Sequence, residues 1–122
     1  MKRLLLLAAL LVAGCSPDYG GLAIEAEGTL LSGTTVSSRR LNIVLGHALR
    51  VHARPRSLTS QVYENSSRVE LRSAEDSIVR VFRDPEQWRW VFVGRAAGTT
   101  CIEVLIDGDV EECIEVVVSG AG

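Results

Sequence analysis

Several patterns that mark enzymes, metal sites and helical proteins are missing from this sequence of 122 residues. No window repeats apolar residues at the 3.6-residue period of an amphipathic helix, which argues against a helical fold. There is no G-x-S-x-G or H-E-x-x-H motif, and neither His47 nor His52 has a Ser or Asp placed for a catalytic relay. We therefore expect no enzymatic activity, no cofactor and no bound metal.

The long apolar run of the chain is too short to cross a membrane. Residues 4–13 are ten apolar residues, whereas a membrane-spanning helix needs about 20. Lys2 and Arg3 precede the run, and the small residues Ala13 and Gly14 close it, which is the pattern of a secretory signal. We predict that residues 1–14 are a signal peptide, that 15–21 are a polar tether, and that 22–119 are one domain.

The residues that end the signal, Val12-Ala13-Gly14-Cys15, resemble the lipobox of bacterial lipoproteins. In that family cleavage falls just before the cysteine, which then carries a diacylglycerol thioether and an amide-linked acyl chain such as palmitate. The resemblance implies that Cys15 anchors the chain to a membrane, and Ser16 implies sorting to the bacterial outer membrane, on its periplasmic side or at the cell surface. The alternative is an ordinary cleaved signal with a cysteine at its boundary.

Positive and negative charges occupy different parts of the sequence. Seven arginines lie within residues 39–72, and six carboxylates with no cation lie within residues 96–122. One interpretation is a field that steers a protein or envelope polysaccharide partner. The interpretation we favour is that the two regions pair across neighbouring strands. No nucleic-acid recognition motif is present, so we expect no nucleic-acid partner.

Short segments rich in Val, Ile and aromatic residues, separated by turn residues, predict an all-β protein. Consecutive short strands joined by tight turns are typical of an antiparallel β-sandwich. The predicted strands are residues 22–27, 41–45, 48–53, 68–73, 78–82, 88–93, 101–106 and 110–118.

Three cysteines are present, so Cys101 and Cys113 remain if Cys15 carries lipid. They flank a predicted hairpin, and an exported protein can keep a disulfide. A three-residue loop, Ile106-Asp107-Gly108, would place the two cysteines directly opposite each other. We therefore predict a Cys101–Cys113 disulfide, because no Cys-x-x-Cys spacing supports a redox or zinc site.

Three aromatic residues, Trp88, Trp90 and Phe92, fall at alternate positions of one predicted strand and so share one face. The small size of the domain favours their burial in the core. The alternative is a binding face on which sugars or partner side chains stack.

The second half of the chain contains the phrases "VELRSAEDSIVRVF", then "WRWVFVGRAAGTTCIEV", and a closing "IEVVV". These phrases resemble bacterial immunoglobulin-like domains of the group-2 type. The resemblance implies an immunoglobulin-like sandwich of seven to eight strands that acts as a non-catalytic binding or structural module. Gly94 and Gly98 are expected where the chain crosses between sheets. The same glycine-threonine phrase also resembles small N-terminal domains of secretin and pilus-assembly proteins, which implies an accessory lipoprotein of a secretion or pilus apparatus as the alternative.

Overall fold

The computed structural model describes residues 18–28, 30, 32–37, 39–58, 63 and 68–120. Within these residues the chain is all β, and most of it lies in nine strands. The strands are β1 (Tyr19–Ala26), β2 (Thr35–Val36), β3 (Arg40–Val44), β4 (Ala48–Ser57), β5 (Val69–Ser73), β6 (Val79–Arg83), β7 (Arg89–Gly94), β8 (Gly98–Ile106) and β9 (Asp109–Ser119).

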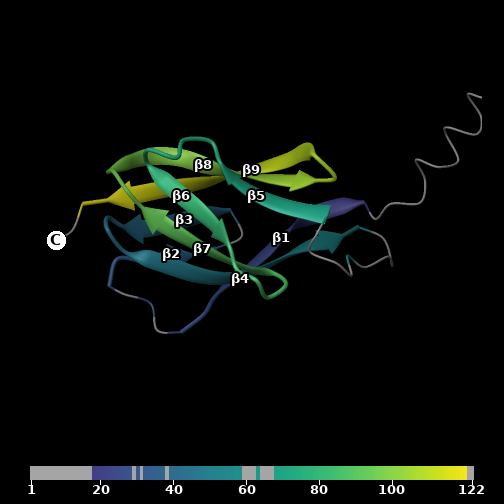
Figure 1. Cartoon of the computed structure of the whole chain (residues 1–122), viewed down its shortest axis with the longest axis horizontal. Helices are drawn as coiled ribbons and strands as arrows, with labels where there is room; N and C mark the ends of the chain where they lie inside the picture. The colour runs from purple at the N-terminus through teal and green to yellow at the C-terminus, as the bar shows by residue number, and fades with distance from the viewer. Residues whose placement is uncertain are drawn as a thin grey trace, which may run out of the picture.

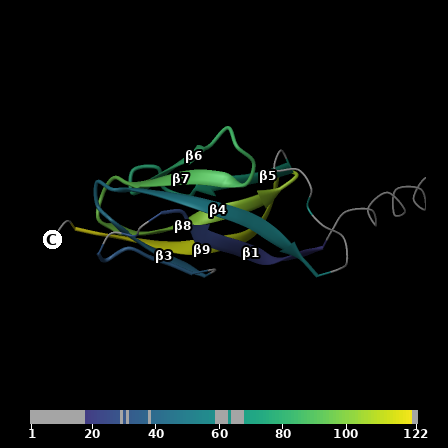
Figure 2. The ribbon, with the colours of Figure 1, turned by 90° about the horizontal axis from the view of Figure 1, so that it is seen from below.

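The strands form two sheets that stack as a sandwich (Figures 1 and 2). The four-stranded sheet has the order β1-β4-β7-β6, and the five-stranded sheet has the order β2-β3-β9-β8-β5. All pairs are antiparallel except β3 with β9, which run parallel. β1 begins at the same end of the molecule as the β8–β9 turn, and β9 finishes at the opposite end (Figure 1).

The core lies between the sheets because alternate residues of each strand point inward. In β4, for example, Leu49, Val51 and Ala53 are buried. In β7 the inward residues Trp90 and Phe92 are each only 1% exposed. One apolar cluster joins inward side chains of both sheets and includes Ile43 of β3. The alternation of the sequence thus translates directly into a two-layer core.

The described strands confirm the all-β sandwich and the eight strand positions expected from the sequence, with three differences. A ninth strand, β2, is two residues long and therefore too short to show a period. The sheets are not wholly antiparallel, since the chain changes sheets after β1 and β3 then lies parallel to β9. Residues 19–21, assigned to the tether from their Gly content, belong to β1.

Gly94 ends β7, where the chain leaves the four-stranded sheet for β8 of the other sheet. Its N–H and C=O bond to the backbone of residues 46 and 47. A Cβ at this position would lie 2.9 Å from Cγ1 of Val118 in the other sheet. The expected crossing between sheets after Gly94 is confirmed, because β7 and β8 belong to different sheets. The physical requirement at Gly94 is the close approach of the neighbouring strands.

Candidate functional site

The outer surface of the four-stranded sheet combines arginines with apolar side chains. Register places Arg50 opposite Val91 and Val91 opposite Phe82 across β4, β7 and β6. The next outward row is Ala48, Val93 and Arg80. Residues directly opposite on neighbouring strands share a face, so the six side chains form one patch. We call it the arginine face, and it consists of Ala48, Arg50, Arg80, Phe82, Val91 and Val93.

The two arginines of this patch are not neutralised by carboxylates of the described residues. Neither Arg50 nor Arg80 forms an ion pair there. The Arg80 guanidinium lies 5.0 Å from the centroid of the Phe82 ring, in cation–π geometry. Phe82 is 44% exposed although it is a large apolar residue. The patch therefore presents unneutralised positive charge beside exposed apolar surface.

A nearby arginine shows how charge is neutralised elsewhere on the same sheet. Arg89 Nε lies 2.7 Å from Glu27 Oε1, and its guanidinium also pairs with Glu86. The hydrogen bond to Glu27 raises the pKa of Arg89. Glu27 and Arg50 line the same open groove of about 500 Å³, and Glu27 pairs there with Arg89. The groove extends the arginine face toward Gly28.

Beside the five-stranded sheet, by contrast, three arginines pair with carboxylates. Arg40 lies 3.8 Å from Glu115, and Arg72 lies 3.2 Å from Glu103. Arg68 donates two hydrogen bonds to Asp107, at 2.9 Å from Nε and 2.5 Å from Nη2, and this contact lowers the pKa of the Asp107 carboxyl. Three arginines of the basic region thus pair with the acidic region, as the favoured interpretation of the charge pattern expects. Arg50 lies on the other sheet, and its positive charge is not paired with a carboxylate of the described residues.

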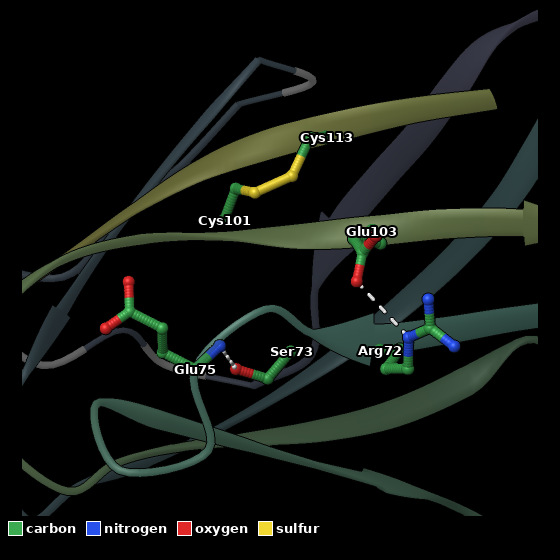
Figure 3. Close-up of a disulfide and its surroundings, with 6 residues drawn as sticks. All are labelled: Arg72, Ser73, Glu75, Cys101, Glu103 and Cys113. Atoms are coloured by element: carbon green, nitrogen blue, oxygen red, sulfur yellow. Dashed lines mark hydrogen bonds and ion pairs between the residues drawn. A yellow bond between two sulfur atoms is a disulfide. The ribbon is translucent and has the colours of Figure 1, made fainter. Parts of the chain in front are cut away.

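Cys101 and Cys113 form a disulfide between β8 and β9, with their Cα atoms 5.5 Å apart (Figure 3). It lies on the outer side of the five-stranded sheet, near the Arg72–Glu103 pair drawn in the same figure. The predicted pairing of these cysteines is therefore present.

The register predicted for this hairpin is wrong. The loop has two residues, Asp107 and Gly108, both with positive φ (51° and 88°), as a type I′ turn requires. A bulge in β9 then shifts the ladder, so that Cys101 faces Glu115 and Cys113 faces Glu103. This differs by two residues from the expected register, and since side chains alternate with a period of two, both cysteines keep the same face.

The aromatic row expected on one strand is buried, and one member is not in the strand. Trp90 and Phe92 point into the core, and Trp88 is 8% exposed. Trp88 precedes β7 in the turn and has φ of 65°, which breaks the alternation. Its ring lies 5.0 Å from the Arg54 guanidinium, which donates to the carbonyl of Tyr63. These aromatics pack in the interior, so they do not form a surface on which a ligand could stack.

Three other expectations, on metal sites, membrane-spanning segments and the signal, can be compared with the structure only within the described residues. In the described part of the chain, no three His, Cys, Asp or Glu side chains gather in a way that could hold a metal ion. No helix among the described residues has the length and apolar character needed to cross a membrane. Cys15 and the predicted signal lie outside the described residues.

The sequence analysis did not predict the arginine face, although the alternation of arginines with apolar residues in β4 indicates part of it. In β4, Arg50, His52, Arg54 and Arg56 alternate with buried residues, so their outward direction follows from the period of two. What the sequence does not contain is the register that brings Arg80 and Phe82 of β6 beside them through β7.

Comparison with known proteins identifies neither a family model nor a curated protein sequence that matches the chain. Solved structures do match its fold. Domains 1–6 of the surface layer protein SbsC superpose with a TM-score of 0.57 at 14% identity, covering 88% of this chain and 14% of that one. Domains 5–6 of the S-layer protein SbsC give a TM-score of 0.57 at 16% identity, covering 88% and 47%. The chain thus spans less than half of the length of these structures, and the likeness concerns the sandwich fold.

Proposed function

We propose that this protein is a lipid-anchored module of the bacterial cell envelope whose immunoglobulin-like domain binds a protein partner without catalysis. The observation that carries the proposal is the arginine face, an unneutralised and partly apolar surface on a rigid sheet. The likeness to S-layer domains supports a structural or binding module of the envelope. The lipobox at Cys15 supports anchoring to the outer membrane through acyl chains.

The strand order supports the immunoglobulin-like assignment. Immunoglobulin domains place the first, second, fifth and fourth strands (A, B, E, D) in one sheet and the third, sixth and seventh (C, F, G) in the other. If β2 and β3 are taken as a continuation of the first strand that changes sheets, β1-β4-β7-β6 match A-B-E-D and β5, β8 and β9 match C, F and G. A disulfide within one sheet replaces the bridge between sheets of antibody domains.

The chemistry of the arginine face favours an acidic protein surface as its partner. Arg50 and Arg80 provide planar donors that bind carboxylates in a bidentate manner. Val91, Val93 and Phe82 add apolar area that a partner side chain can cover, and a mixture of arginine and aromatic residues is typical of the centres of protein interfaces. A polysaccharide partner would instead favour several exposed aromatic rings for stacking, whereas this face offers the single ring of Phe82 and both tryptophans are buried.

The proposal is tested by cross-linking in intact cells followed by purification from solubilised envelope. We expect an acidic protein to co-purify with the natural chain and to be lost when Arg50 and Arg80 are both changed to Glu. The matched control is Arg95→Glu, an exposed arginine in the β7–β8 connection outside the arginine face. Retention of the partner by the double variant would contradict the assignment of this face. A stoichiometric channel protein as the partner would instead favour a secretion accessory, and binding only to glycan would refute a protein partner.

The anchor is tested separately at Cys15. Labelled palmitate should enter the natural chain and be absent from the Cys15→Ser variant. Incorporation that persists in the variant would refute acylation at this residue.

A further inference from the structure

A bulge of two glycines interrupts β1 close to the start of the domain. Tyr19 pairs with Ser57 and Leu22 pairs with Pro55, so Gly20 and Gly21 together lie opposite the single residue Arg56 of β4. Gly21 has φ of 113°, and a Cβ built on it would have no heavy atom within 4 Å. The sheet edge is therefore open at Gly21, whereas a Cβ at Gly20 would lie 3.1 Å from the Leu58 side chain.

A cavity of about 270 Å³ lies at this opening. Its lining consists of the two glycines and Leu22 of β1, Arg56 of β4, Arg39 just before β3, and Glu112 of β9. It is therefore built by both sheets. It is slightly smaller than pockets for drug-sized ligands, which occupy about 300–1,000 Å³, and its size suits a small polar group.

The charges around this cavity favour an anion. The guanidinium groups of Arg39 and Arg56 have no carboxylate partner among the described residues. The single carboxylate of the lining, Glu112, accepts a hydrogen bond from the Tyr19 hydroxyl at 2.6 Å. Burial, reinforced by Glu112, raises the pKa of Tyr19, so this hydroxyl stays protonated and keeps its bond to the carboxylate. The lining thus carries two positive charges and one negative charge, and the negative one is already hydrogen-bonded to Tyr19.

We propose that this cavity is a binding site for a phosphate-type anion held by Arg39 and Arg56. Guanidinium forks match the geometry of phosphate oxygens and form charge-assisted hydrogen bonds with them. In the anchored protein the anion is the phosphate of a phospholipid headgroup with net negative charge, in which no choline cation competes with the two arginines, and this choice of source rests on the proposed acylation of Cys15. Gly20 is five positions after Cys15, and an extended chain spans at most about 3.6 Å per residue, so the bulge lies within roughly 18 Å of the Cys15 Cα.

The anion site is tested on the full purified chain in an uncharged detergent, with thermal unfolding followed by tryptophan fluorescence. Sodium phosphate should raise the melting temperature more than sodium chloride of equal ionic strength. Changing Arg39 and Arg56 together to Gln should weaken the apparent affinity for phosphate about tenfold or more, since each hydrogen bond to a charged group contributes substantially. The Arg95→Gln variant should respond as the natural chain does. Equal responses to phosphate and chloride, or an unchanged response in the double variant, would overturn the site.

The source of the phosphate is tested with the same chain in lipid nanodiscs. Nanodiscs that contain phosphatidylglycerol in addition to phosphatidylcholine should raise the melting temperature of the natural chain and not that of the double Gln variant. A response to free phosphate without a response to phosphatidylglycerol would overturn the headgroup as the source. The mass of the peptide that contains Cys15 is measured in parallel. A peptide without acyl groups would refute the anchor, and the phosphate titration would still decide whether the anion site exists.

Discussion

Breaking the Cys101–Cys113 bond is expected to lower the free energy of unfolding without abolishing the fold. The two cysteines are 12 residues apart in sequence, and for such a loop the chain-entropy model gives about 2.8 kcal/mol. This value is an upper limit, because the ladder from Gly98 opposite Val118 to Ile106 opposite Asp109 already favours the hairpin. If the loss of unfolding free energy lies between about half of this value and the whole of it, the melting temperature of a domain of this size should fall by roughly 6–20 °C.

The assay is urea unfolding with and without reductant, followed by tryptophan emission, which reports on the buried Trp90. A double variant with serine in place of both cysteines should match the reduced natural chain and should not respond to reductant. The thioether proposed at Cys15 is not cleaved by reductant, so it does not complicate the comparison. An unchanged midpoint on reduction would show that the bond imposes no constraint. Complete loss of β structure at room temperature would show that the ladder cannot hold the hairpin alone.

Three further predictions concern single residues of the sandwich. Gly94→Ala should destabilise the domain by about 1–3 kcal/mol because its Cβ would crowd Val118; an unchanged urea midpoint would contradict this close approach. Phe92→Ala should cost about 3–5 kcal/mol, measured in the same way, since it empties a fully buried site. Arg68 lowers the pKa of Asp107, so this pair stabilises the fold above the pKa of the unfolded carboxyl, about 3.9, and the contribution is lost as the pH falls through the lower folded pKa. Both groups are about half exposed, so Asp107→Asn should remove less than about 1 kcal/mol at neutral pH and progressively less as the pH falls below the unfolded pKa; an effect that does not diminish in acid would refute the ion pair.

The strands could be predicted from the sequence because each one carries its own period-two signal, as β4 does with Leu49, Val51 and Ala53. The place of the β8–β9 hairpin could also be predicted, from the Asp107-Gly108 dipeptide. Its register could not, because the loop has two residues where three were expected, and a bulged residue in β9 shifts the ladder further without a local mark in the sequence. Trp88 was misplaced for a related reason: its left-handed backbone is imposed by the hairpin and not by a preference of tryptophan.

The candidate sites depend on pairings between distant segments. Arg80 reaches Arg50 only through the register of β7 with both of its neighbours. The cavity at the β1 bulge joins Arg39, which precedes β3 of one sheet, with Arg56 of β4 in the other sheet. Alternation in the sequence predicts which side of a strand each arginine faces, but it does not predict which other strand lies beside it.

Intact-mass spectrometry of the chain purified from bacterial membranes decides whether the protein is lipid-anchored. We expect a chain that begins at Cys15, carries the mass of a diacylglycerol and an amide-linked acyl group, and has Cys101 and Cys113 joined. A chain that retains residues 1–14, or one that begins at Cys15 without added lipid mass, would contradict this expectation.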